Sequence, residues 1–360
     1  MPDRRADLCR PGQKMLGTRY YYYVGLRGAG GRQLRAALLA STALVAAGLP
    51  AAAQDATWLA SPGSVSYNSD ANWSSGTVPA GTAFFGASNI TGLSLFTNDF
   101  SNETDVGGWT FNAGAGNYTF ANGQFLNFNG AGIVINGGSA TITVLDQNSL
   151  NFLNASTAGS ATITNNGGGI LNFYNASTAG SATITNNPGG TLRFYNTSTA
   201  GYATITNNPD GILNFYDKST AGTATITTYS GVFFYGTSTA GSATITNNAA
   251  LDFNNNSTAG SAAIINNFVL GFFDNSTAGS ATITNNGAMD FGGASTAGNA
   301  TITNSGGNLY FLRTSTAGNA AITNTASGTV DFSGSAGPAR DNRLSGGSIA
   351  GAGNFYLGAR

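Results

Sequence analysis

The tetrapeptide Ser-Thr-Ala-Gly recurs nine times between residues 156 and 318, and its spacing limits the folds open to this chain. The steps between successive starts are 21, 21, 21, 19, 19, 19, 19 and 20. A fixed period of roughly 20 residues is typical of a solenoid, in which one repeat buries its apolar face only when a neighbour stacks on it. The copies begin at Ser156, Ser177, Ser198, Ser219, Ser238, Ser257, Ser276, Ser295 and Ser315.

Each repeat contains two short segments in which apolar and polar residues alternate. Successive side chains of a strand point to opposite faces, so Ala161 and Ile163 share one face while Thr162 and Thr164 share the other. We expect Ile163 and its equivalents to point inward. In the second segment a Phe stands four positions before each tetrapeptide, as Phe173 does, and it also points inward. Its mostly polar neighbours are expected to face out; they include Asn172, Arg193, Asn214 and Asp252.

Two strands and three corners per repeat predict an all-β fold, a right-handed parallel β-helix of about ten coils of roughly 19–21 residues each. Equivalent residues then stack ~4.8 Å apart and form internal ladders of Ile and of Phe. The Gly that ends each tetrapeptide supplies backbone freedom for one corner. The paired residues Asn165 and Asn166 suit another corner, where Asn tolerates a left-handed backbone and amides can stack.

The chain divides into four segments. Residues 1–53 are predicted to be an extended signal peptide, because a basic flank precedes an uncharged apolar stretch over residues 36–48 and small residues follow it. Cleavage is expected between Ala53 and Gln54. Residues 54–130 are interpreted as an N-terminal cap with irregular β coils, residues 131–335 as the regular repeats, and residues 336–360 as a truncated continuation of the solenoid.

Composition excludes several classes of function. Eight of the 14 Lys and Arg lie within residues 1–35, so the remainder carries 6 basic and 13 acidic residues, a net charge of 6 − 13 = −7. An acidic body argues against nucleic acid as a partner. The chain has no His, and its single Cys lies in the leader at Cys9. Because Ser-His and Cys-His arrangements and His/Cys zinc sites are thereby excluded, we expect no enzyme activity, no catalytic residues, no cofactor and no metal.

The processed chain resembles the passenger region of bacterial autotransporters, the type V secretion family. The resemblance rests on residues 58–86, on residues 106–111 together with residues 133–143, and on the Ser-Thr-Ala-Gly coils. It implies export by the Sec machinery and a C-terminal β-barrel that carries the passenger to the outer-membrane surface. Nothing after Phe332 is long enough to supply such a barrel, so we expect it as a partner absent from this chain.

The leading functional hypothesis is an exported, non-enzymatic surface stalk, structural or adhesin-like, whose host, matrix or neighbouring-cell target the sequence does not name. The alternative is a ligand-binding solenoid. It would bind carbohydrate through the cap that contains Trp58, Trp73 and Trp109, or ice through an outward lattice of threonines. Threonine is also simply a good residue for the solvent face of a strand. The lattice consists of Thr162, Thr164, Thr183, Thr185, Thr204, Thr206, Thr225, Thr227, Thr244 and Thr246.

Overall fold

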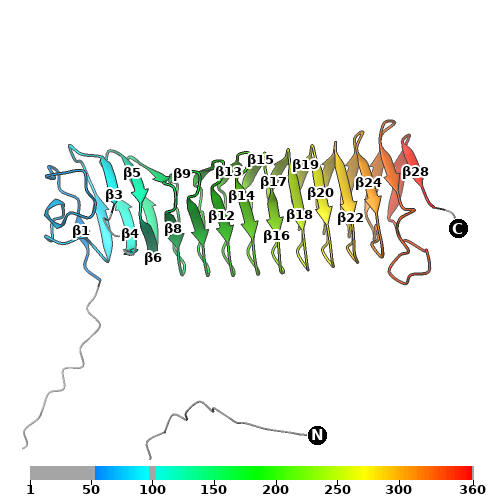
Figure 1. The fold of residues 1–360 in the computed structure, drawn as a ribbon, viewed down its shortest axis with the longest axis horizontal. Helices are drawn as coiled ribbons and strands as arrows, with labels where there is room; N and C mark the ends of the chain where they lie inside the picture. Colours follow the sequence, from blue (N-terminus) through cyan, green and yellow to red (C-terminus); the bar gives the residue numbers. More distant parts are fainter. Residues whose placement is uncertain (1–52, 97–102, 359–360) are drawn as a thin grey trace, which may run out of the picture. The chain divides into compact units, whose positions relative to one another are not determined.

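The computed structural model describes residues 53–96 and 103–358, and these residues form a parallel β-solenoid of stacked coils (Figure 1). This confirms the all-β fold predicted from the repeat. The predicted signal peptide up to residue 52 lies outside the described residues. Apart from the strands, the described part of the chain contains one short 3-10 helix, η1 (Asp70–Asn72).

Two parallel sheets run along the stack. From β2 onward successive strands belong alternately to one sheet and to the other, whereas β1 and β2 both belong to the 15-stranded sheet. The 15-stranded sheet contains β1 (Ala56–Thr57), β2 (Thr82–Phe85), β4 (Glu103–Phe111), β6 (Phe125–Ile135), β8 (Ser149–Phe152), β10 (Ile170–Phe173), β12 (Thr191–Phe194), β14 (Ile212–Phe215), β16 (Val232–Phe234), β18 (Ala250–Phe253), β20 (Val269–Phe272), β22 (Ala288–Phe291), β24 (Asn308–Phe311), β26 (Thr329–Asp331) and β28 (Asn354–Tyr356). The 13-stranded sheet contains β3 (Gly92–Phe96), β5 (Asn117–Gly123), β7 (Ser139–Val144), β9 (Thr162–Asn165), β11 (Thr183–Asn186), β13 (Thr204–Asn207), β15 (Thr225–Thr228), β17 (Thr244–Asn247), β19 (Ala263–Asn266), β21 (Thr282–Asn285), β23 (Thr301–Asn304), β25 (Ala321–Asn324) and β27 (Ser348–Gly351).

The stack has more coils than the ten expected, because the segments on either side of the clear repeats join the same sheets. Residues 54–130 supply β1 to β5 and part of β6, although their turns follow no fixed spacing. At the other end β27 pairs with β25, and β28 pairs with β26. The expected number was too low because it was based on the repeated sequence, and these outer coils lack the tetrapeptide.

The interior is built from ladders of identical side chains, as the alternation predicts. Ile163 pairs in register with Ile184, and both are fully buried. From Phe128 to Phe332 the phenylalanine rings stack coil upon coil, with successive centroids 4.6–5.1 Å apart. This spacing matches the ~4.8 Å between neighbouring strands. One apolar core therefore runs along the described coils, and each repeat is buried by its neighbours.

The tetrapeptide forms a third side of each coil. Its Thr makes a one-residue parallel bridge to the Thr of the next coil, as Thr178 does to Thr199. The Gly that follows has a positive φ, 61° at Gly180, and its N–H donates to the Oγ1 of Thr178 at 3.0 Å. The corner role predicted for this glycine is confirmed.

The paired asparagines behave differently from the expectation. The first of each pair, such as Asn165, ends a strand and is fully buried, and its Nδ2 donates to Oδ1 of Asn186 at 2.8 Å and to the carbonyl oxygen of Gly169 at 3.1 Å. The predicted amide ladder is confirmed, but the left-handed backbone is not found at Asn165 or Asn166. Within this corner a positive φ comes later, at Gly168, Gly189 and Asp210. Asparagines adopt the left-handed backbone at the corner after the Phe, with φ of 55° at both Asn175 and Asn196. There the side chain of Asn196 accepts a hydrogen bond from the N–H of Asn175 at 3.0 Å.

Candidate binding faces

The predicted threonine lattice forms the outer side of the 13-stranded sheet; we call it the threonine face. Its members pair residue by residue, for example Thr183 with both Thr162 and Thr204. On each strand the first Thr is exposed and the second is half-buried. The ten predicted threonines thus lie together in two columns. The face extends one coil further than predicted, since Thr141 pairs with Thr162 on the preceding coil.

The register of the threonine face survives the change in repeat length. The step between tetrapeptides is 219 − 198 = 21 before Ser219 and 238 − 219 = 19 after it, yet Thr225 still pairs with Thr244. The shortening comes from the asparagine corner, which a solenoid can trim without disturbing its core. On the next coil Ala263 and Ile265 interrupt the face, and Ala321 interrupts it again further along.

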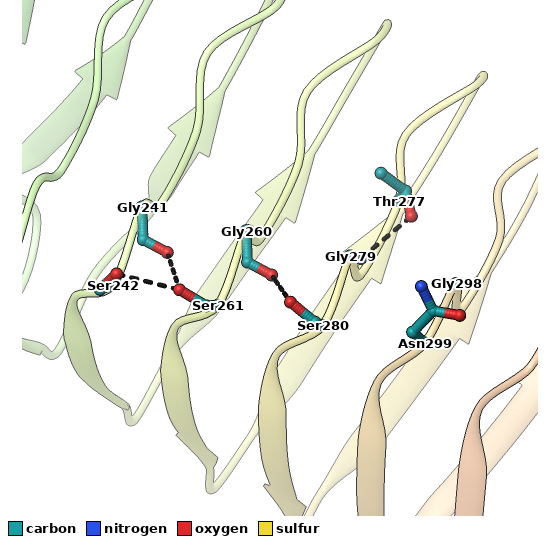
Figure 2. A pocket seen from close by; sticks show the side chains of 9 residues that line it. All are labelled: Gly241, Ser242, Gly260, Ser261, Thr277, Gly279, Ser280, Gly298 and Asn299. Atoms are coloured by element: carbon teal, nitrogen blue, oxygen red, sulfur yellow. Dashed lines mark hydrogen bonds between the residues drawn. The ribbon is translucent and has the colours of Figure 1, made fainter.

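A shallow groove follows the third side of the coils, beside the row of corner glycines (Figure 2). The Oγ of Ser261 donates to the carbonyl oxygen of Gly241 at 3.3 Å and lies 2.9 Å from Oγ of Ser242. Figure 2 marks both contacts. Ser280 repeats the contact with Gly260 at 3.4 Å. Most of these polar groups are already partnered along the stack, so the groove offers many weak contacts and no concentrated site.

The polar row predicted on the outer side of the 15-stranded sheet faces outward, but part of it is covered. Asn172 and Asn214 are only 6% and 8% exposed. The Nδ2 of Asn214 donates to Oη of Tyr216 at 2.8 Å. Stacked tyrosines flank this row, and the rings of Tyr195 and Tyr216 are 4.9 Å apart. Because these rings cover one another's faces, only their edges reach solvent.

The tryptophan alternative is wrong as to the residues involved. Trp58, Trp73 and Trp109 are at most 2% exposed and pack in the core of the first coils. Trp58 and Trp73 meet edge to face at 5.2 Å, and Nε1 of Trp73 donates to the carbonyl oxygen of Tyr67 at 2.7 Å. A ring must expose a face to stack on a sugar, and large aromatic residues are more often buried than exposed. These tryptophans fill the end of the core.

The described residues contain no group of three or more His, Cys, Asp or Glu side chains that could hold a metal ion. The pKa values of a few of their titratable groups are raised, mainly by burial. Burial raises the pKa of Tyr67, whose hydroxyl accepts a hydrogen bond from Nε1 of Trp109 at 3.1 Å. Burial, together with repulsion from Asp290, raises the pKa of Asp252 to about 6. The same described residues also contain no helix that is long and apolar enough to cross a membrane.

The expected cleavage point lies at the very start of the described residues. The carbonyl oxygen of Gln54 accepts a hydrogen bond from the N–H of Gly81 at 2.9 Å, and its side chain accepts one from Thr77 at 3.0 Å. Gln54 is therefore already tied to the first coil, while Ala53 just before it is exposed. Cleavage between the two remains a prediction.

In comparisons with known proteins, no family model, no curated protein and no solved structure matches this chain.

Proposed function

We propose that this protein is an exported structural stalk with an adhesin-like, non-enzymatic role at the cell surface. The observation that carries the proposal is the unbroken double-sheet core, in which the same side chains recur on successive coils. Such a stack is held by nearest-neighbour contacts and presents long, repeated outer faces. Its surface favours many weak contacts whose effects multiply, which suits a spacer or adhesive better than a single binding pocket.

Export is inferred from the leader and from the autotransporter resemblance. The uncharged stretch over residues 36–48 follows a basic flank and is too short for a membrane span, which needs ~20 residues. After cleavage the chain would have no Cys, and the continuous core would make disulfides unnecessary outside the cell. The Sec machinery would be the first partner, and a separate β-barrel would carry the chain to the outer membrane.

A reporter fusion tests the export step. Residues 1–60 are joined to an alkaline phosphatase that is active only after export from a Gram-negative host. We expect activity and a mature N-terminus at Gln54. The matched control carries Leu38→Arg and Leu39→Arg, which place charges in the apolar stretch and should abolish export. Activity that persists in this control, or an uncleaved and inactive parent fusion, would overturn the proposal.

Ice binding is a second candidate, favoured by the regular register of the threonine face over the coils from Thr141 to Thr246. A flat, repeated hydroxyl array could match a lattice of ordered water. Purified protein should then show thermal hysteresis that Thr204→Lys removes. Thr223→Lys, at an exposed position outside the face, should leave it intact. Absence of hysteresis in the unmodified protein rejects this candidate.

A further inference from the structure

The outer side of the 15-stranded sheet changes character beyond the tyrosine stack. From β16 to β24 the outward residues at one position are Phe233, Asp252, Gly271, Asp290 and Tyr310, and they pair in register. An aromatic ring and a carboxylate thus alternate from coil to coil, except at Gly271. The two carboxylates stand two strands apart, which corresponds to roughly 10 Å of backbone spacing.

Gly271 has no side chain, and the aromatic ring that fills its place in the row belongs to Phe273, two residues later on the same coil. Two ring atoms, Cε2 and Cζ, lie where a side chain of Gly271 would be, and two others, Cδ1 and Cε1, lie close to where a side chain of Gly292 on the next coil would be. A substituent at either glycine would collide with it or crowd it. The ring therefore covers Gly271, the position between Asp252 and Asp290 in this row, and it remains partly exposed. Stacked tyrosines such as Tyr195 instead pack against one another.

Both carboxylates beside this ring are without a protein partner. Asp252 and Asp290 are half-buried, and among the described residues neither has a hydrogen bond or an ion pair. By contrast, Asp274 accepts a hydrogen bond from the N–H of Asn255 at 2.9 Å, and Asp331 accepts one from Ser333 at 2.7 Å. Burial raises the pKa of both unpartnered groups, so the fold places them where their charge is disfavoured until a donor or cation arrives.

We propose that Phe233, Asp252, Phe273, Asp290 and Tyr310 form a binding face, the acid–aromatic face, for a linear polysaccharide of amino sugars. The ammonium groups of such a chain complement the two free carboxylates and lie favourably over aromatic rings. Its flat sugar faces can pack on the part of the Phe273 ring that reaches solvent. A chain that runs along the stack would meet acids and rings in alternation, coil after coil.

An extended basic peptide is the competing class of partner, and the geometry favours the sugar. An extended peptide is bound most strongly when it adds a strand to a free sheet edge. On the acid–aromatic face the strands pair on both sides, as β20 does with β18 and β22, so no edge is offered there. This face instead offers a partly exposed aromatic ring beside two carboxylates. The inference rests on the adhesive part of the proposed function and names its partner.

Binding is measured by isothermal titration calorimetry on the full chain near neutral pH. The probes are a β-1,4-linked glucosamine hexasaccharide, its fully N-acetylated counterpart and hexalysine. We expect the glucosamine chain to bind most tightly. Asp252→Asn and Asp290→Asn should each weaken it about tenfold, as the loss of one charge-assisted hydrogen bond does. Phe273→Ala should weaken it about fivefold through the lost ring contact.

The matched control is Asp210→Asn, which removes the same charge at an exposed corner whose positive φ Asn also tolerates. It should leave binding within about twofold of the parent. Circular dichroism verifies that each variant folds, and Phe273→Leu replaces Phe273→Ala if the latter does not. Three results would each overturn the inference: no binding of the glucosamine chain, equal loss in Asp210→Asn, or tighter binding of hexalysine or the acetylated chain. None depends on the export reporter, so the two proposals fail separately.

Discussion

The serine that opens each tetrapeptide is buried without a hydrogen-bond partner for its hydroxyl group. All nine are fully buried, and their hydroxyl oxygens have no hydrogen-bond partner among the described residues. A buried hydroxyl without a partner lowers stability by about 1–3 kcal/mol relative to a satisfied one. The small size that a tight corner requires is therefore the property of serine that the fold uses, and its hydroxyl contributes nothing to stability.

Ser198→Ala should accordingly raise the stability of the fold by about 1 kcal/mol, because it removes the unsatisfied group and almost no volume. The urea midpoint of unfolding, followed by circular dichroism, measures the change. Ser181→Ala, at an exposed position one coil earlier, is the control and should shift the stability by less than about 0.5 kcal/mol. A lower midpoint for Ser198→Ala would show that the hydroxyl has a stabilising partner.

Asp252 should make stability fall as pH rises. Its folded pKa of about 6 lies above the usual 3.8, so the folded state binds the proton more tightly than the unfolded chain does. The resulting stabilisation is complete below about pH 4 and is lost as pH rises through about 6. The titratable groups facing it are Tyr235 and Asp290. Allowing for solvent screening, the effect is on the order of 1 kcal/mol. Asp252→Asn should flatten this slope in urea unfolding measured from pH 4 to pH 7.5; an unchanged slope would contradict the assignment.

At the scale of strands and corners, the alternation of apolar and polar residues correctly predicts which side chains of a strand point inward. Ile163, Phe173 and Thr162 lie on the faces expected, because a period of two leaves one choice once the apolar side is known. The role of Asn165 was only half predictable. An Asn pair suits a left-handed corner or a buried ladder equally well, and only packing selects between them. Packing also determines that Trp109 is buried in the core. It likewise determines the position of the Phe273 ring, which requires glycines at Gly271 and Gly292 on two successive coils.

The asparagine ladder has one defect that can be repaired. Thr228 stands where the other Ser-Thr-Ala-Gly coils have Asn, and its Oγ1 accepts a long hydrogen bond of 3.3 Å from Nδ2 of Asn207. Its hydroxyl donates instead to the carbonyl oxygen of Ser230, which leaves the ladder broken before Asn247. Thr228→Asn should reconnect it and stabilise the fold by about 1 kcal/mol, since the shorter coils elsewhere accept Asn at this position.

Amide hydrogen exchange checks the repair locally. Protection should rise on β13, β15 and β17 in Thr228→Asn and stay unchanged on distant coils such as β5. Thr227→Asn places the same side chain at the neighbouring outward position and serves as the control. If both variants change protection equally, the ladder is not the cause.

On the scale of the whole stack, the fold should tolerate the loss of a complete coil. Deleting residues 245–263 removes one full repeat and joins Thr244 to Ile264, so the strand still reads Ala-Thr-Ile with Ile inward. Both sheets keep their register, and the stack shortens by about 4.8 Å. Because each coil contacts only its neighbours, we expect cooperative unfolding at a slightly lower urea midpoint.

Deleting residues 245–262 instead leaves Ala263 in place and tests why register matters. This one extra residue shifts the side-chain alternation, so that Ile264 turns toward solvent and Ile265 toward the core. The two deletions have almost the same length and composition, and they differ in which side chains after the junction point toward the core. The shifted variant should lose protection from hydrogen exchange over the coils next to the junction and should aggregate, because an apolar strand face is exposed. Equal stability of the two deletions would mean that the corners, and not the inward ladders of Ile and Phe, hold the coils in register.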